Sequence, residues 1–169
     1  MDADLIESLA ARAALSDLLA DYAAAIDWFD FGAMEHSFWP DSRFDYGLFQ
    51  GGFEAFRDWV VDFESQYERR LHMFGLPVIR IEGDTARIDA TSVILCRKDG
   101  SDEYFWGRYL FTAARREGIW RFSGITYVIN LLSRAPATTG DDAIPLHWAD
   151  DLRADHPLSQ RGTVRHAPA

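Results

Sequence analysis

The sequence predicts an α+β domain in which N-terminal helices pack on one face of a strongly curved, mixed and mostly antiparallel sheet. Three observations support this prediction. Apolar residues recur at helical spacing before Arg69-Arg70 and alternate after it. The alternating segments are separated only by short turns, which is typical of an antiparallel meander. Helices that precede a run of strands indicate a helical layer segregated on one face of a sheet.

Length and composition indicate one globular domain with a core of ordinary size. The chain has 169 residues, of which 48% are hydrophobic and 14% aromatic, enough to build a core and to line a cavity. The formal net charge of −10 argues against nucleic acid and anionic membrane surfaces as partners, because both attract basic proteins. The acidic N-terminus and the absence of a long apolar run predict a soluble, cytoplasmic protein.

Helical spacing predicts three helices. The first covers about residues 4–28 and carries apolar residues at Leu15, Leu18, Leu19, Tyr22 and Ile26. Asp30 can cap a short second helix, which has apolar positions at Phe31, Met34 and Phe38 and ends at Trp39-Pro40. The third helix follows Gly51-Gly52 and presents one apolar face, made of Phe56, Trp59, Val60, Phe63 and Tyr67.

Alternation predicts one short strand, Arg43 to Tyr46, and four long strands after the third helix. The long strands cover residues 71–81, the segment between the Glu82–Asp84 turn and the Asp99-Gly100 hairpin, residues 104–114 and residues 119–132. The domain is therefore placed at residues 1–132. Residues 133–169 are rich in Ala, Pro, Thr, Gly and Asp, which predicts a partly irregular C-terminal tail.

Two ionisable residues in apolar surroundings indicate acid–base chemistry. Asp27 ends the first predicted helix, where a carboxylate faces the negative end of the helix dipole and is poorly placed for stability. His72 stands in the apolar segment Leu71–Leu76. A buried aspartate and a buried histidine suggest a general base and the group that orients it. Structural roles, as a helix-end acid and as a satisfied core histidine, are the alternatives.

Strand parity places the His72 side of the sheet against the helices and predicts a cavity between the two layers. The predicted substrate-binding residues are Tyr22, Trp28, Phe56, Phe74, Leu76, Cys96, Phe105, Tyr109, Ile125 and Tyr127. The opposite parity predicts an outer face of Trp106, Arg108, Leu110, Trp120 and Phe122.

The sequence predicts neither a metal nor another cofactor. Cys96 is the single cysteine, so neither an internal disulfide nor a cysteine metal cluster can form. The other histidines, His36, His147, His156 and His166, show no metal-ligand spacing with an acidic partner. A glycine-rich phosphate loop at a strand–helix turn is also absent, which argues against a nicotinamide cofactor.

Five short motifs resemble the SnoaL-like branch of the nuclear-transport-factor-2-like superfamily, which includes scytalone dehydratase and hexachlorocyclohexane dehydrochlorinase. The motifs are Tyr22-x-x-x-x-Asp27-x-x-Asp30, Phe38-x-Pro40-Asp41, Leu71-His72-Met73, Gly107-Arg108-Tyr109 and Gly118-Ile119-Trp120-Arg121. The resemblance covers about residues 5–132 and implies a cone-shaped fold. It also implies that Asp27 and His72 form a catalytic dyad and that Tyr46 holds a catalytic water.

The resemblance implies a cofactor-independent lyase that eliminates water, formaldehyde or halide from a hydrophobic, aromatic or polycyclic small molecule. An isomerase or cyclase of the same fold is an alternative. The superfamily also contains non-catalytic members such as the small subunit of aromatic-ring dioxygenases, so a binding or structural subunit is another alternative. The predicted apolar outer face, together with the resemblance, suggests a homo-oligomer, either a trimer or a dimer.

Overall fold

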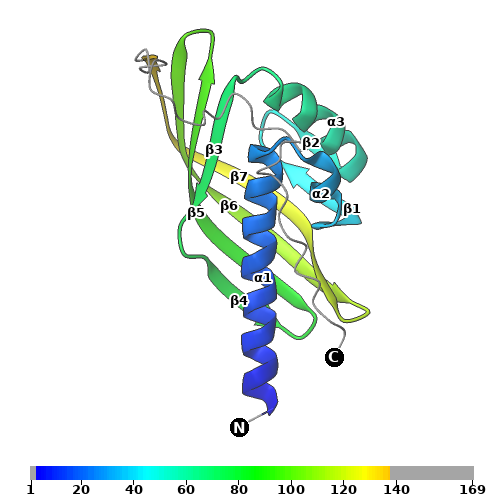
Figure 1. Cartoon of the computed structure of the whole chain (residues 1–169). Helices are drawn as coiled ribbons and strands as arrows, with labels where there is room; N and C mark the ends of the chain where they lie inside the picture. Colours follow the sequence, from blue (N-terminus) through cyan, green and yellow to red (C-terminus); the bar gives the residue numbers. More distant parts are fainter. Residues whose placement is uncertain (1–2, 138–169) are drawn as a thin grey trace.

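A computed structural model describes residues 3–137, which form a helical layer on one face of a curved sheet (Figure 1). The predicted α+β class is confirmed. In chain order the elements are α1 (Ala3–Asp27), α2 (Phe31–Glu35), β1 (Phe38–Asp45), β2 (Gln50–Gly52), α3 (Phe53–Glu64), β3 (Arg69–Phe74), β4 (Val78–Glu82), β5 (Thr85–Lys98), β6 (Ser101–Arg116) and β7 (Ile119–Pro136). Helix α1 crosses the open face of the sheet, and α3 packs over β1 and β2.

The described sheet has seven strands in the order β2-β1-β7-β6-β5-β3, with β4 also paired to β5. The β1–β7 pair is parallel and the other pairs are antiparallel, so the sheet is mixed. Both hairpin turns of the meander have two residues with positive φ, Asp99-Gly100 and Glu117-Gly118. This backbone matches the right-handed twist of the flanking strands, and it lets β5, β6 and β7 pair over their full length and curl around the helices.

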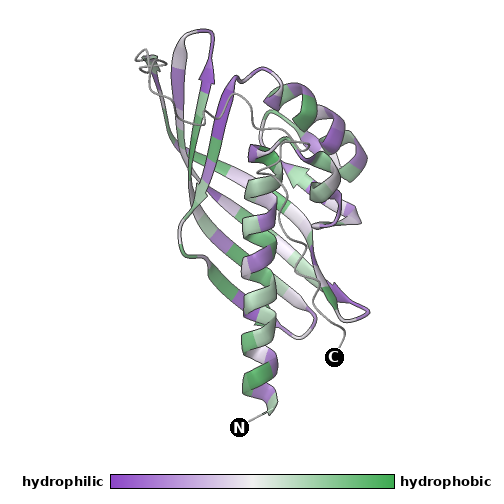
Figure 2. Ribbon diagram, viewed as in Figure 1, coloured by the Kyte–Doolittle hydropathy of each residue, from purple (hydrophilic) through white to green (hydrophobic). Residues whose placement is uncertain are grey.

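The core lies between α1, α3 and the concave face of the sheet. Residues of α1 at helical spacing are buried there, including Leu15, Leu19, Tyr22 and Ile26. The first turns of α1 project beyond the sheet, and their apolar residues remain exposed at Leu5, Ile6 and Leu9 (Figure 2). Within residues 3–137, no helix is long and apolar enough to cross a membrane.

The predicted first long strand, residues 71–81, is wrong: it is two strands, β3 and β4. Both pair with β5, but the chain leaves the sheet between them at Gly75-Leu76-Pro77. Pro77 cannot donate a ladder hydrogen bond, and it biases Leu76 toward an extended conformation. Leu76, which parity had placed in the cavity, is consequently 98% exposed.

Other predicted boundaries need smaller corrections. Asp30 caps α2 as expected, accepting a hydrogen bond from the Ala33 amide at 2.9 Å. Phe38 belongs to β1 rather than to the second helix. Pro40 does not end the strand, because β1 lies near the β2–β1 end of the sheet, where proline is tolerated. Strand β7 continues past Leu132 to Pro136 because it stays paired with β6. The predicted tail is described only as far as residue 137, and its remainder lies outside the described residues.

A bulge in β7 overturns part of the predicted outer face. Thr112 pairs with Gly124 and Ala113 with Phe122, so Ser123 is an extra residue. One extra residue reverses the facing of every side chain beyond it. Trp120 and Phe122 therefore point inward and are 8% and 0% exposed.

Candidate functional site

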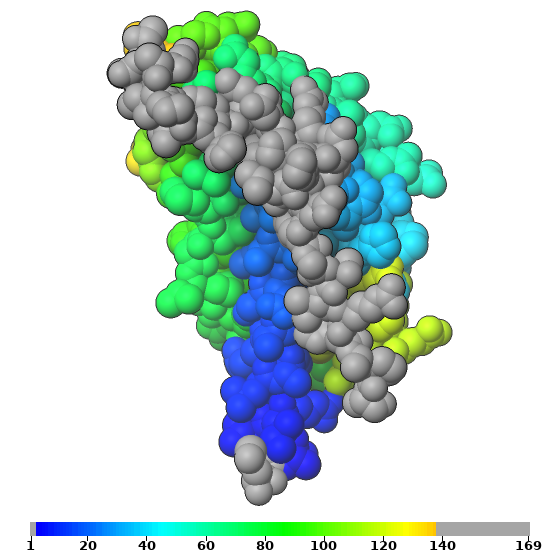
Figure 3. All heavy atoms as spheres, viewed as in Figure 1, coloured from blue at the N-terminus to red at the C-terminus, as the bar shows by residue number. Residues whose placement is uncertain are grey.

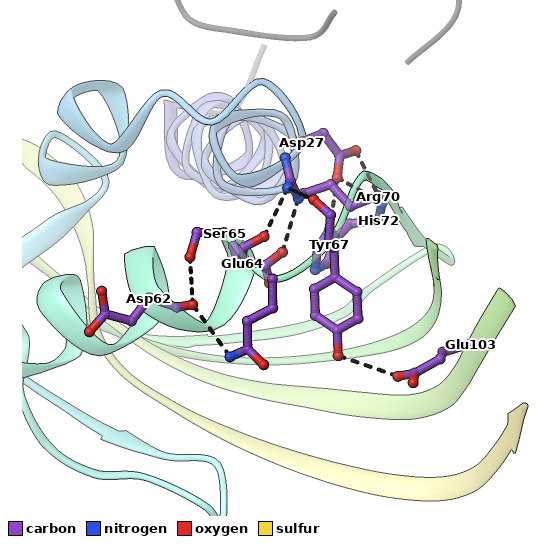
Figure 4. A network of polar contacts seen from close by, with 9 residues as sticks. Asp27, Asp62, Glu64, Ser65, Tyr67, Arg70, His72 and Glu103 are labelled. Carbon is purple, nitrogen blue, oxygen red and sulfur yellow. Dashed lines mark hydrogen bonds and ion pairs between the residues drawn. The ribbon is translucent and has the colours of Figure 1, made fainter. Parts of the chain in front are cut away.

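Asp27 and His72 meet at the junction of α1 and β3. The His72 Nδ1 lies 2.8 Å from Asp27 Oδ1, and the backbone N–H of His72 donates to both carboxylate oxygens at 3.0 Å. Both residues are 8% exposed. The helix end alone would disfavour this acid, but the strand supplies donors to both of its oxygens. The structure thus brings together the two residues that the sequence singled out (Figure 4).

The pairing fixes the chemical state of the imidazole. A carboxylate only accepts hydrogen bonds, so Nδ1 carries the hydrogen and Nε2 of the neutral ring keeps a lone pair. Burial lowers the pKa of His72, but the hydrogen bond and negative charge of Asp27, with Glu64 adding to them, outweigh burial and raise that pKa above its ordinary value. His72 can therefore accept a proton readily once it is neutral.

His72 forms part of the wall of a cavity between the helices and the sheet. The lining is mostly aromatic and aliphatic: Tyr22, Ile26, Tyr46, Leu48, Trp59, Val60, Phe63, Glu64, Tyr67, His72, Ile94, Cys96, Phe105, Tyr109, Tyr127 and Ile129. The cavity volume is about 70 Å³. On this measure one water needs roughly 10–15 Å³, so the cavity has room for a small group of atoms.

Phenol hydroxyls converge on this cavity from both layers. The hydroxyls of Tyr22 and Tyr46 are hydrogen-bonded at 2.8 Å, and the Tyr22 and Tyr109 ring centroids lie 6.0 Å apart. Burial raises the pKa of Tyr22, Tyr46 and Tyr109 well above the ordinary phenol value. The Tyr127 hydroxyl is buried without a hydrogen-bond partner among the described residues. These groups stay protonated and can only share hydrogen bonds with a ligand.

Several predicted site residues do not line the cavity. Phe56 and Ile125 are buried in the core, where Phe56 stacks behind Tyr46 at 5.4 Å between centroids. Phe74 packs edge-on against Tyr109 at 5.1 Å, and Trp28 is half-buried outside the lining. Leu76 is exposed for the reason given above. The remaining predicted binding residues do line the cavity, namely Tyr22, Cys96, Phe105, Tyr109 and Tyr127.

Asp27 itself faces a second hollow on the outside of the molecule. This shallow groove runs between α1 and the β3–β4 segment, which lie side by side on the face in Figure 3. Asp27, His72, Phe74 and the small residues Ala20, Ala23 and Ala24 line it. His72 lines both spaces, so the Asp27–His72 pair separates the cavity from the outer groove.

Sequence reasoning missed two charged residues beside His72, namely Glu64 and Arg70. Glu64 is the last residue of α3 and lines the cavity. Its position continues the buried series Phe56, Val60, Glu64 at intervals of four, and this spacing was the available signal. The Arg70 guanidinium donates to the carbonyls of Glu64 and Tyr67 at 2.9 and 2.7 Å, which caps the end of α3.

The Glu64–Arg70 contact is buried and imperfect. Arg70 Nε lies 3.1 Å from Glu64 Oε2, and each side chain is 8% exposed. Neither of these two atoms makes an aligned hydrogen bond within the described residues. Burial raises the pKa of the Glu64 carboxyl above its ordinary value, although the charges of His72 and Arg70 act in the opposite direction. Figure 4 shows Glu64, Arg70, His72 and Asp27 gathered at one end of the sheet.

A second polar cluster begins at Tyr67 of the cavity lining and extends away from the cavity to Glu103 and Arg134. Tyr67 donates to Glu103 at 3.3 Å, and Arg134 pairs with the other Glu103 oxygen at 2.5 Å. Within residues 3–137, no group of three or more His, Cys, Asp or Glu side chains is arranged to hold a metal ion.

Comparisons with known proteins agree with this fold. Residues 7–126 match the family described as the SnoaL-like domain. A hexachlorocyclohexane dehydrochlorinase superimposes with a TM-score of 0.72 at 18% identity, covering 81% of this chain and 98% of its own. A protein of Novosphingobium aromaticivorans, provisionally named scytalone dehydratase, gives 0.69 at 18%, covering 79% and 95%. An NTF2-like protein of that bacterium gives 0.69 at 20%, covering 76% and 87%.

Two further matches are closer in sequence. A structure from Novosphingobium aromaticivorans, provisionally named as an aromatic ring hydroxylase, is 29% identical with a TM-score of 0.68, covering 73% of this chain and 92% of its own. Uncharacterized proteins of Mycobacterium tuberculosis and Mycobacterium bovis are 29% identical over 94 residues. That match covers 54% of this chain and 61% of the length of these curated relatives.

Proposed function

The chain belongs to the SnoaL-like family, and on this premise we propose that it is a cofactor-independent lyase with Asp27 and His72 as its general-base dyad. The observation that carries the proposal is the 2.8 Å contact between His72 Nδ1 and Asp27 Oδ1 at the wall of an apolar cavity. A histidine that is oriented by a carboxylate and lines an apolar cavity is an arrangement suited to general-base catalysis.

In the proposed reaction, His72 Nε2 removes a proton from a carbon of the substrate. Asp27 keeps the ring in the correct tautomer and stabilises the imidazolium that forms, as the acid of a catalytic triad does. The carbon's electron pair forms a double bond as the leaving group departs from the adjacent carbon. Tyr46, linked to Tyr22 at 2.8 Å, donates a hydrogen bond to the developing negative charge, directly or through a water.

The proposed substrate is a small hydrophobic molecule with an aromatic ring. The lining has phenylalanine, tyrosine and tryptophan side chains on both layers, which suits contact with the faces and edges of a ring. The volume of about 70 Å³ argues against a polycyclic skeleton. The similar dehydrochlorinase and provisionally named dehydratase are consistent with halide or water as leaving group.

A second candidate is a non-catalytic subunit of an aromatic-ring oxygenase. The 29% identity to the structure provisionally named as an aromatic ring hydroxylase is consistent with a link to enzymes that oxygenate aromatic rings. In such a subunit the Asp27–His72 pair would only join α1 to β3. The two candidates differ in whether removing the imidazole abolishes a reaction.

A substrate screen followed by paired substitutions tests the proposal. Purified protein is incubated with aromatic and terpenoid alcohols and halides, and mass spectrometry detects loss of water, formaldehyde or hydrogen halide. His72→Ala should then lower turnover by at least about 10²-fold to 10⁴-fold, the usual contribution of a general base. Asp27→Asn should lower turnover in the same direction, because an amide cannot stabilise the imidazolium.

Two matched substitutions control for nonspecific effects. His36→Ala removes an exposed histidine at the end of α2, and Asp30→Asn keeps a side chain that can cap α2. Both should retain wild-type turnover, and circular dichroism checks that every variant is folded. His72→Ala turnover within a few-fold of wild type would remove His72 as the base and favour the subunit.

A further inference from the structure

The cavity contains an ionisable group that the dyad mechanism leaves unused, the carboxyl of Glu64. Glu64 and His72 line the same cavity, and Glu64 is 6% exposed. Its Oε2 has no aligned hydrogen bond, although Arg70 Nε is 3.1 Å away. A buried carboxyl is expensive to leave without hydrogen bonds, and its position at a helix C-terminus is also unfavourable. Among the described residues, the structural role open to this acid is its buried contact with Arg70, which lacks an aligned hydrogen bond.

We propose that Glu64 is the proton donor to the leaving group, and that the departing group is consequently a hydroxyl. This inference rests on the proposed lyase function and extends it. A hydroxide ion is a poor leaving group and needs a proton, whereas chloride leaves without one. His72 acts as the base on the carbon, and Glu64 acts as the acid on the oxygen bound to the adjacent carbon.

The step balances without another reactant. The C–H and C–O bonds break, the C–H electron pair becomes the second bond of the alkene, and the oxygen leaves as water with the proton of Glu64. The two groups then stand as imidazolium and carboxylate. Transfer of the His72 proton to Glu64, directly or through a water in the cavity, restores the starting state.

The other proton-bearing groups of the cavity are less suited to this role. Asp27 accepts hydrogen bonds from His72 on both oxygens. One hydroxyl hydrogen of Tyr22 and Tyr46 is used in the bond between them. Burial raises the pKa of the phenols and of the Cys96 thiol, so these groups retain their protons near neutral pH. Glu64 supplies the carboxyl group of the cavity lining, and its Oε2 has no aligned hydrogen bond within the described residues.

The titration of Glu64 depends on neighbours from every element around it. The charged and titratable groups that face it or share its cavity are Tyr22 and Asp27 of α1, Tyr46 after β1, Tyr67 before β3, Arg70 and His72 of β3, Cys96 of β5, Tyr109 of β6 and Tyr127 of β7. Because His72 and Glu64 interact, they titrate as a pair, and the active form holds one proton between them. Turnover of a hydroxyl substrate should therefore follow a bell-shaped pH profile.

The test compares leaving groups on one skeleton. Wild type and Glu64→Gln are assayed with an aryl β-hydroxyketone and with the β-chloroketone of the same skeleton. Glu64→Gln should lose roughly 10²-fold to 10⁴-fold in loss of water, the usual contribution of general acid catalysis. Loss of chloride should stay within a few-fold of wild type. In Glu64→Gln, the decrease in turnover at high pH should disappear, because activity then requires only that His72 is neutral.

Two further variants separate the donor role from a structural one. Glu64→Gln leaves the buried Arg70 charge without its partner. The double variant Glu64→Gln/Arg70→Gln removes both charges and is therefore assayed as well. It should show the same leaving-group pattern as Glu64→Gln. Glu103→Gln alters another buried, arginine-paired glutamate that is not in the lining. It should leave the leaving-group pattern and the pH profile unchanged, whatever its effect on stability.

Titration without substrate gives an independent measurement. Carbon-13 NMR of glutamate-labelled protein, with the Glu64 signal assigned from Glu64→Gln, should give a midpoint above the ordinary value of about 4.3. A midpoint at or below that value would identify a permanently ionised partner of Arg70 and overturn the donor role. Equal effects of Glu64→Gln on both leaving groups would also overturn it. If wild type eliminates neither group, the lyase proposal fails, and the donor role fails with it.

Discussion

At the scale of single residues, opposing effects of burial and pairing set the chemistry of the site. Burial alone would lower the pKa of His72 and raise that of Glu64, which would leave both groups neutral. The contact with Asp27 reverses the outcome for His72, whereas the imperfect contact with Arg70 does not reverse it for Glu64. One cavity thus contains a histidine that binds a proton more readily and a carboxyl that releases one less readily.

The raised pKa of His72 predicts a pH-dependent contribution to stability. A group whose pKa is higher in the folded state than in the unfolded state stabilises the fold fully below the unfolded value, about 6.5 for histidine. This contribution disappears as pH rises through the folded pKa. His72→Asn keeps an N–H donor toward Asp27 but cannot be protonated. We expect it to lower the free energy of unfolding more at a pH of about 5.5 than at about 9.

Urea denaturation of wild type and His72→Asn at the two pH values measures this difference. His36→Asn, at an exposed histidine, should show a much smaller pH dependence. An equal loss of stability in His72→Asn at both pH values would contradict the prediction, since it would mean that His72 has the same pKa in the folded and unfolded states.

At the scale of elements, the bulge at Ser123 determines which side chains of β7 reach the cavity. Before the bulge, Trp120 and Phe122 face inward, and after it Tyr127 and Ile129 line the cavity. Gly124 lies directly after the bulge and pairs with both β1 and β6. An added Cβ there would lie 2.8 Å from the Arg43 carbonyl oxygen and 3.0 Å from Thr112 Oγ1.

Gly124→Ala should therefore destabilise the protein, by about 1–3 kcal/mol as overpacking of a filled interior usually does. The backbone carbonyl of Arg43 cannot move without disturbing the parallel β1–β7 pair. Gly32→Ala is the matched control, because its added Cβ meets nothing closer than 3.6 Å and it lies in helix α2. It should be neutral or stabilising by up to about 1 kcal/mol. Thermal or urea denaturation that ranks the two variants equally would contradict this account of the bulge.

At the scale of the whole molecule, the side of the sheet turned away from the helices carries a row of apolar residues that the described helices leave uncovered. Cross-strand neighbours Met73, Val93, Trp106 and Leu131 form a row across β3, β5, β6 and β7. Met73, Trp106 and Leu131 are 47%, 36% and 65% exposed. Contiguous apolar area of this kind usually marks an interface. The homo-oligomer expected from the sequence therefore stays a prediction, with this row at its contact surface.

Trp106→Glu should reduce the mass in solution from a dimer or trimer to a single chain of 19.2 kDa. A buried, unpaired carboxylate at the centre of an apolar interface is strongly unfavourable. Leu76→Glu adds the same charge at a residue that is 98% exposed and lies outside the row, and it should leave the mass unchanged. Light scattering at micromolar concentration measures both. A wild type that is already monomeric would contradict the prediction.

The sequence by itself determined the α+β class, the arrangement of helices before a meander of strands, and the two residues, Asp27 and His72, that the structure brings into contact. These features depend on local periodicity, on turn residues such as Asp99-Gly100, and on an acid and a histidine placed in apolar segments. Interactions between neighbouring residues generate such signals, so a single chain carries them without knowledge of distant contacts. The motif resemblance then related Asp27 to His72 across the 45 positions that separate them.

The tertiary structure alone decided which of the predicted residues reach the cavity. Parity along an uninterrupted strand placed Leu76 inside and Trp120 and Phe122 outside, and the break at Gly75–Pro77 and the bulge at Ser123 reversed these positions. Glu64 was passed over because its importance comes from Arg70 and His72, which lie on strand β3 and meet it at the end of α3. Bulges and buried charge contacts arise from how separate elements pair and pack against one another, so the pattern within either element does not specify them.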